Sequence, residues 1–267
     1  KVIAEIKSLK TRGWSGAVMF VDDELFYPKD EVLKFLVDLE KLNIKWVSQA
    51  TMTALLDREL MDAAYRAGCC GIMVGFETFD PCAYEKIKKY QNAREGIDEA
   101  IKYANNLGIA VGALVIMGLD SDTAATAKET IKILRQSKFG LIDFSVIRAY
   151  PKTSIYRDLL AQGRMQEGWW LLPDGAPYLD AMNDAVPAYL RVYYSPKNFT
   201  PRELQIQVLE CEAAVNSPFC LNKLKNYYHL FVQGDKLITF RIFLASLFMY
   251  GQARLMLWKI KLVKPNQ

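Results

Sequence analysis

The feature that most limits how this 267-residue chain can fold is a unit that recurs five times. In each unit a short run of apolar residues ends in polar or acidic side chains, and a helix-like segment follows. Apolar runs that alternate with amphipathic helices are typical of a parallel sheet covered by helices, whose ligands bind beyond the C-terminal strand ends. We therefore expect the polar residues to lie at one rim. The runs and the residues that follow them are 16–21 with Asp22 and Asp23, 44–48 with Gln49, 71–76 with Glu77, 109–117 with Gly118, and 142–147 with Arg148.

The segments between and after the runs have helical periodicity, and several begin with a capping residue or end at a glycine. Strand–helix repeats of this kind predict the α/β class, as a partial (β/α) TIM-like barrel with parallel strands over residues 1–162. We predict a mainly helical C-terminal extension over residues 163–267. The predicted helices are 2–12, 28–42, 57–67, one starting at Asp80-Pro81, 95–107, 123–137, 154–162 and 201–215.

Composition and charge exclude several classes of protein. Hydrophobic residues make up 51% of the chain and charged residues 24%, which indicates a folded protein with a sizeable core. The net charge of +4 is too small to indicate nucleic-acid binding by itself. The five cysteines show neither C-x-x-C metal spacing nor a disulfide framework, so we expect a reducing, cytoplasmic location. Residues 237–263 are apolar, but Arg241, Arg254 and Lys259 interrupt them, and no membrane-spanning helix is expected.

The strand ends resemble those of a known family, the radical S-adenosylmethionine (SAM) enzymes. The likeness is carried by residues 20–26 (FVDDELF), 46–50 (WVSQA), 67–69 with 75–78, 112–118 followed by Asp120, and 150–156 followed by Gly163 and Arg164. The subgroup that it most resembles often carries an N-terminal cobalamin-binding domain. The resemblance covers about residues 1–170 and implies SAM and a 4Fe–4S cluster as cofactors, with cobalamin as a further cofactor for methyl transfer.

For three acidic rim residues, the resemblance implies contacts with the cofactor or the substrate. Glu77 would accept hydrogen bonds from the ribose hydroxyls of SAM, a role suited to a carboxylate. The alternative is that Glu77 caps the following helix, although Asp80 is better placed for that. Asp22 and Asp23 would hold the methionyl amino group or the substrate, and the equal alternative is a strand-end turn with helix capping.

The other three rim residues have less specific roles. Gln49 would bond substrate or cofactor, although polar residues at strand ends are also ordinary. Gly118 would let the backbone approach the adenine, or it only makes the turn. Arg148 would neutralise a carboxylate or phosphate, or pair with Asp143 or another acidic residue.

Two departures from the family's pattern limit what this chain can do. The three cysteines that bind the cluster, spaced C-x-x-x-C-x-x-C, are absent, and a cluster requires thiolate ligands. Because no strand precedes the first helix either, we expect a chain truncated before the cluster-binding cysteines, and no metal ligand or catalytic residue is assigned in it. The second departure is Lys152, which stands where the family usually has glycine in a proline–glycine–threonine turn.

Two other functions stay open at this point. One is a cluster-free barrel that binds a nucleoside-like ligand or a protein partner. The other is an unrelated hydrolase or lyase that uses Asp22, Asp23 and Glu77 as acid–base groups. For the radical SAM interpretation we expect a small-molecule or lipid-like substrate, an electron donor protein and no nucleic acid. The aromatic, basic residues 240–264 pack within the fold, complete a contact with a partner, or make a peripheral membrane contact.

Overall fold

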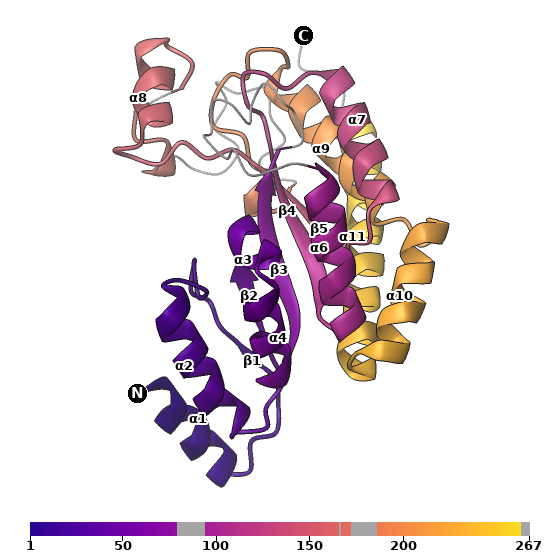
Figure 1. Cartoon of the computed structure of the whole chain (residues 1–267). Helices are drawn as coiled ribbons and strands as arrows, with labels where there is room; N and C mark the ends of the chain where they lie inside the picture. The colour runs from indigo at the N-terminus through magenta and orange to yellow at the C-terminus, as the bar shows by residue number, and fades with distance from the viewer. Residues whose placement is uncertain (79–93, 166, 172–185, 263–267) are drawn as a thin grey trace.

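Five parallel strands form one sheet in the order β1-β2-β3-β4-β5. The computed structural model describes residues 1–78, 94–165, 167–171 and 186–262. The strands curve into a half-barrel whose C-terminal strand ends meet at one rim, which confirms the predicted fold class (Figure 1). Their bounds are Val18–Met19 for β1, Trp46–Ala50 for β2, Cys69–Glu77 for β3, Ala110–Met117 for β4 and Ile142–Val146 for β5.

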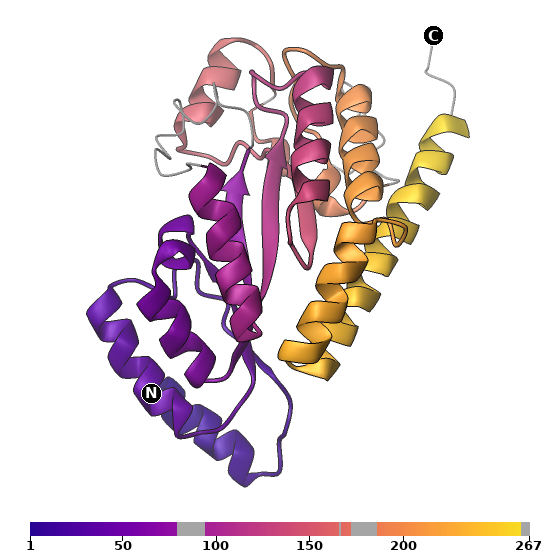
Figure 2. The ribbon, with the colours of Figure 1, turned by 45° about the vertical axis from the view of Figure 1, so that its right-hand side comes forward.

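Helices cover the convex face of this sheet. The helix α6 lies in front of β4, and α3 and α4 pack on β3 (Figure 2). Several helices start at side-chain caps, since Thr51, Asp57 and Thr123 each accept a hydrogen bond from a backbone N–H of the first turn. The helices of this part are α1 Val2–Thr11, α2 Lys29–Glu40, α3 Met52–Leu56, α4 Arg58–Arg66, α6 Arg94–Leu107, α7 Ala124–Gln136 and α8 Ser154–Ala161.

The two faces of the sheet differ in burial. Alternate strand residues such as Trp46, Ile72 and Phe144 are buried against the helices. Their neighbours, such as Gln49 and Met73, are only partly buried and point to the concave face. In a strand successive side chains alternate between faces, so this pattern shows which residues can reach a ligand inside the half-barrel.

The C-terminal extension is helical, as predicted. Its elements are η1 Trp169–Leu171, η2 Ala188–Leu190, α9 Pro201–Val215, α10 Leu221–Gln233 and α11 Lys236–Leu262. The helix α9 has the predicted bounds and begins with a capping box formed by Thr200 and Glu203. It packs on β5, while α11 packs on α9. No helix within the described residues is long and apolar enough to cross a bilayer. The domain division at residue 163 stays a prediction.

A few local predictions differ from the structure. The run expected to end at Ser48 extends through Gln49, which lies inside β2 because Gln49 pairs in register with Met73. The short helix α3 was not predicted, and it forms because Thr51 caps it. The helix expected to start at Asp80-Pro81 lies outside the described residues.

The packing of Trp46 gives a test of the core. Its ring is fully buried, meets Phe20 edge-on at 5.5 Å, and its Nε1–H donates to the Ala67 carbonyl at 2.8 Å. We expect Trp46→Phe to lower the free energy of unfolding by about 2–3 kcal/mol, because it leaves that buried carbonyl unpaired and a cavity behind. The matched control is Trp258→Phe at a 60% exposed position, with an expected change below about 0.5 kcal/mol. Urea unfolding measures both, and equal losses would contradict the packing described here.

Candidate functional site

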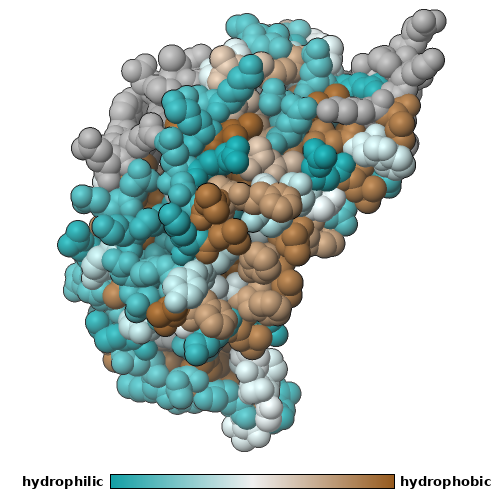
Figure 3. All heavy atoms as spheres, turned by 90° about the vertical axis from the view of Figure 1, so that its right-hand side faces the viewer, coloured by the Kyte–Doolittle hydropathy of each residue, from teal (hydrophilic) through white to brown (hydrophobic). Residues whose placement is uncertain are grey.

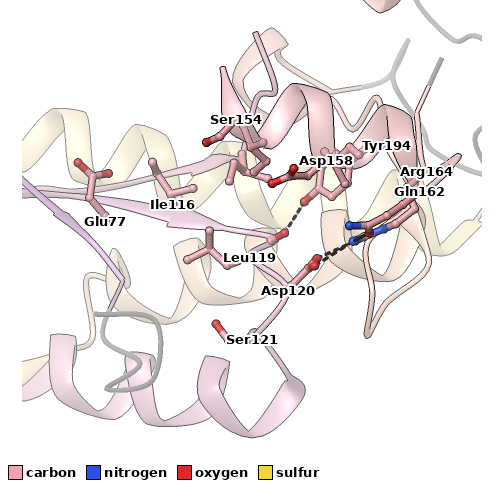
Figure 4. Close-up of a pocket in the computed structure, with 14 residues that line it drawn as sticks. Glu77, Ile116, Leu119, Asp120, Ser121, Ser154, Asp158, Gln162, Arg164 and Tyr194 are labelled. Carbon is pink, nitrogen blue, oxygen red and sulfur yellow. Dashed lines mark hydrogen bonds and ion pairs between the residues drawn. The ribbon is translucent and has the colours of Figure 1, made fainter. Parts of the chain in front are cut away.

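A cavity of about 580 Å³ opens at the C-terminal rim of the sheet, and we call it the rim cavity. Its volume falls within the range of small-molecule sites. It lies between the ends of β3 and β4 and the helix α8, and Figure 4 shows the side chains that face it. Polar lining residues include Glu77, Asp120, Ser154, Asp158, Gln162, Arg164 and Tyr194, and Ile116, Leu119 and Ile147 are among the apolar ones.

Glu77 enters this cavity from a strained backbone. It is the last residue of β3 and follows a shift in register after Gly75. Its φ is 60°, and the N–H of Thr78 donates to the carbonyl of Phe76 at 2.7 Å across it. A hydrogen bond between residues i and i+2, with a positive φ at the residue between them, defines the rarer, strained form of the γ-turn. Such strain costs on the order of 1–3 kcal/mol and concentrates at ligand sites, where the surrounding structure enforces it.

The loop after β4 is held by a buried carboxylate and a tyrosine. Asp122 accepts hydrogen bonds from the N–H groups of Gly118 at 2.7 Å and Leu119 at 2.9 Å. The Tyr194 hydroxyl donates to the carbonyl of Gly118 at 2.6 Å, and burial raises the pKa of this hydroxyl far above its usual range. Gly118 has a φ of 100°. The turn and its contact with Tyr194 therefore account for the glycine, and the same contact shapes one wall of the rim cavity.

An ion pair joins the loop after β4 to the segment after α8. The Arg164 guanidinium contacts Asp120 through two bonds, Nη1 to Oδ2 at 2.9 Å and Nη2 to Oδ1 at 2.7 Å. The Arg164 Nε–H donates to the Ser195 carbonyl at 2.8 Å. The hydrogen bonds to Asp120 raise the pKa of Arg164 further above its already high value. The paired arrangement fixes the outer wall of the rim cavity (Figure 4).

A second cavity, also of about 580 Å³, lies on the concave face of the sheet, and we call it the concave-face cavity. Strand residues such as Gln49, Met73 and Leu114 line one side of it. Tyr189 of η2, together with Ile242 and Met249 of α11, line it as well. The lining is mostly apolar, with Gln49, Ser48, Asp143 and Tyr189 as its polar side chains.

Two carboxyl groups near the concave face are held in a low-polarity environment. Glu212 of α9 is 1% exposed, and its Oε1 has no hydrogen-bond partner among the described residues. Burial, and then the nearby Asp143 carboxylate, raise the pKa of Glu212 to about 8. Burial also raises the pKa of Asp143. Glu212 is therefore mostly protonated at neutral pH.

The six predicted rim residues separate into groups. Glu77 and Gly118 line the rim cavity, and Gln49 lines the concave-face cavity. Asp22 and Asp23 are exposed after β1 and line neither cavity within the described residues. The structure thus does not bring them into one cavity with Glu77, as a shared acid–base site would require.

The remaining predicted residue and the residues that were missed come from the loops. Arg148 follows β5 at the same rim, where its Nη1 donates to the Tyr150 hydroxyl at 3.4 Å. Asp120 and Arg164 belonged to the matched segments but were not predicted as site residues, because their pairing joins positions 44 residues apart. The sequence contained no signal for Tyr194, which comes from the C-terminal extension.

The described cysteines do not fit an iron–sulfur cluster. Cys69, Cys70, Cys211 and Cys220 are buried free thiols, and burial raises the pKa of Cys70 to about 11 and that of Cys211 to about 12. A cluster requires thiolates, which these environments disfavour. Across the described ranges, no three His, Cys, Asp or Glu side chains are grouped so that they could hold a metal ion.

Comparison with known proteins identifies the family. The model of the radical SAM superfamily matches residues 1–134, half of the chain, and the chain belongs to this superfamily. It is 29% identical over 171 residues to the hopanoid C-2 methylase of Rhodopseudomonas palustris, covering 62% of this chain and 32% of that protein. It is 23% identical over 140 residues to the bacteriochlorophyllide d C-12(1)-methyltransferase of Chlorobaculum tepidum, covering 52% and 31%. The chain thus spans about a third of the length of these relatives.

A solved structure shows the same fold. The radical SAM methyltransferase TsrM from Kitasatospora setae, with cobalamin and a 4Fe–4S cluster bound, superposes with a TM-score of 0.54 at 18% identity. The match covers 60% of this chain and 33% of TsrM. The predicted resemblance to radical SAM enzymes is confirmed by the family match.

Replacing Gly118 tests the wall of the rim cavity. An added Cβ would lie 2.1 Å from the Tyr194 hydroxyl and 2.9 Å from Leu204 Cδ2. We expect Gly118→Ala to lower the free energy of unfolding by about 2–5 kcal/mol, from backbone strain and overpacking together. Gly163→Ala is the matched control, because Gly163 also has a positive φ but nothing within 4 Å of the added Cβ, so only about 1–2 kcal/mol is expected. Thermal or urea unfolding of both variants measures the loss of stability. If Gly118→Ala loses no more stability than Gly163→Ala, the close contact of Gly118 with Tyr194 is wrong.

The raised pKa of Glu212 predicts how stability changes with pH. Between pH 4.5 and about 8 the folded state binds this proton more tightly than the unfolded state, so stability falls as pH rises through that interval. We expect Glu212→Gln to remove this decline and to stabilise the protein at pH 7 by up to a few kcal/mol. Glu210→Gln, at an exposed position of the same helix, is the control and should leave the slope unchanged.

Urea unfolding at several pH values between 5 and 7 measures this effect. Burial lowers the pKa of Lys223 to about 7, which adds an opposing dependence above that pH, so the lower interval separates the two groups. The assignment fails if Glu212→Gln and the wild type show the same slope.

Proposed function

We propose that this chain forms the SAM-binding rim and the substrate cavity of a radical SAM methyltransferase. The observation that carries the proposal is Glu77, a carboxylate at the end of a central parallel strand, held in a strained backbone at the mouth of the rim cavity. Membership of the radical SAM superfamily supports SAM as the ligand of that cavity. The names of the relatives, a methylase and a methyltransferase, support methyl transfer as the reaction.

In this proposal Glu77 binds the ribose. A carboxylate accepts hydrogen bonds from both hydroxyls of a ribose diol, and in a partly enclosed cavity these bonds are stronger than in water. Gly118 and Ile116, beside Glu77 at the end of β4, form the surface on which the adenosyl group would lie. SAM bound there would supply the methyl or adenosyl group for the reaction, and Gln49, Asp22, Asp23 and Arg148 remain candidates for contacts with the rest of the cofactor or the substrate.

An apolar substrate fits the second cavity. The concave-face cavity is lined by Met19, Val47, Met73, Leu114 and Ile242 on most sides. Burial of apolar surface supplies the binding energy in such sites, while a few polar groups fix orientation, here Gln49 and Asp143. Relatives that act on a hopanoid and on bacteriochlorophyllide d, as their names state, support a bulky apolar substrate.

The cluster ligands would come from outside this sequence. The buried thiols of the described chain do not fit an iron–sulfur cluster, and the C-x-x-x-C-x-x-C spacing is absent from all 267 residues. The proposal therefore requires three cysteines in that spacing elsewhere in the native coding sequence, and their absence there would contradict it. Cobalamin, present in the TsrM structure, is proposed as the methyl carrier by analogy with that fold.

Ligand pairs that differ only in the ribose hydroxyls test the role of Glu77. We expect the chain to bind adenosine at least about tenfold more tightly than 2′,3′-dideoxyadenosine, because hydrogen bonds to a charged acceptor contribute about 1.5–3 kcal/mol. Glu77→Gln should remove most of this preference. Glu129→Gln on the exposed face of α7 is the matched control and should keep it. Calorimetry measures the binding of both ligands to all three proteins.

Two outcomes separate the proposal from its alternative. The ribose role of Glu77 is wrong if wild type and Glu77→Gln discriminate equally between the two ligands. Tight binding of SAM itself by this iron-free chain would instead favour a cluster-free barrel that binds nucleoside-like ligands.

A further inference from the structure

The C-terminal helix α11 has apolar side chains on two opposite sides but is covered on one of them only. It has 27 residues, and Ala253, Leu257 and Ile260 are buried where it packs on the fold. An apolar stripe on a helix is normally buried against another apolar surface. The opposite side of α11 has no such cover within the described residues, so it needs an apolar surface outside them.

The uncovered side carries a continuous row of large apolar residues. Phe240, Leu244, Phe248, Leu255, Trp258 and Leu262 recur at helical spacing, and each is between 45% and 65% exposed. Residues at this spacing lie on one side of a helix. We call this row the α11 face. In the space-filling view of this side, apolar side chains form a band that runs over the molecule toward its C-terminal end (Figure 3). Exposed apolar surface of this extent is typical of an interaction site.

The charge around the α11 face has one sign. Residues 236–262 contain five basic residues and no acidic one, and Arg241, Arg254 and Lys259 are exposed beside the row. Residues 213–267 contain eight basic residues and one acidic residue, while the rest of the chain has 26 basic and 29 acidic residues. The positive charge of the protein is therefore concentrated around the α11 face, which makes this face complementary to an anionic surface.

We propose that the α11 face docks on an anionic lipid bilayer, with the helix lying in the plane of the interface. Phenylalanine, leucine and tryptophan side chains enter the boundary between headgroups and acyl chains, and the arginine and lysine side chains contact lipid phosphates. A protein partner fits less well, because protein interfaces are depleted in lysine and an acidic partner would meet a mostly apolar, aromatic row. This docking is independent of the proposed SAM site, since it uses the outer side of α11 and not the residues that line either cavity.

Sedimentation of the full chain with lipid vesicles tests the proposal. We expect binding to vesicles of equal parts phosphatidylcholine and phosphatidylglycerol to be at least about tenfold tighter than to phosphatidylcholine alone, and to weaken with added salt. Phe248→Ser with Trp258→Ser should weaken binding to the mixed vesicles about tenfold or more. Arg254→Gln with Lys259→Gln should reduce both the affinity and its dependence on salt. The matched control is Lys34→Gln with Val37→Ser on the exposed side of α2, which should bind as wild type does.

Folding and self-association are followed in the same samples. The four substitutions on α11 are at exposed positions, so we expect unchanged circular dichroism and unfolding midpoints. Equal sedimentation of wild type and the α11 variants with mixed vesicles would overturn the proposal. So would a dimer in solution, without lipid, that Phe248→Ser with Trp258→Ser converts to a monomer, because the face would then be an interface between two copies.

Discussion

The structure depends on the parallel pairing of β3 with β2 on one side and β4 on the other. The pairs Ser48↔Ile72 and Ile72↔Val111 hold three strands in one direction, so that their C-terminal ends meet at the same edge. Each residue of β3 is thereby placed either against the covering helices or on the concave face. The shift in register between Gly75 and Glu77 occurs where β3 reaches the rim, and it places the Glu77 side chain at the cavity and not in the core.

The same sheet explains why the C-terminal extension is needed. A half-barrel leaves its concave face uncovered, and parallel sheets require cover on both faces. Tyr189 of η2 and Ile242 and Met249 of α11 provide part of that cover, and the concave-face cavity is the space left between them and the strands. The substrate cavity in our proposal is therefore a joint product of the sheet and the extension. Because α11 covers the sheet with one side, its other apolar side remains outward.

The sequence predicted the elements whose signals are local. The five apolar runs became the five strands, and the helix at 201–215 was predicted to the residue because Thr200 as cap and Pro201 at the first position are a strong start signal. The departure at Lys152 also has a local cause. Lys152 has a φ of 70° in the turn where the Thr153 N–H donates to the Tyr150 carbonyl at 3.3 Å, and glycine adopts that backbone without strain. The turn therefore keeps its shape with lysine, at a conformational cost.

The sequence could not predict features that depend on distant contacts. Asp120 and Arg164 each fit several roles until folding brings them together. The helical pattern places Glu212 on the buried side of its helix, but an acidic residue is not normally expected in a core. The pattern also gives no sign that Asp143 lies nearby. Sequence patterns report the average environment of a residue, whereas pKa values and ion pairs depend on individual neighbours.

The position of each strand within the sheet explains why the predicted acidic residues differ. The one strand that pairs with β1 in the described sheet is β2, so Asp22 and Asp23 follow a strand at its edge, and both are exposed. Glu77 ends a strand that has a neighbour on each side, and it is half-buried in the rim cavity. A carboxylate in water is screened by solvent and ions, while one in a partly enclosed cavity interacts more strongly with a bound ligand. A carboxylate therefore binds a cofactor best at the end of a strand that has a neighbour on each side, inside a partly enclosed cavity. This is why the proposed function rests on Glu77.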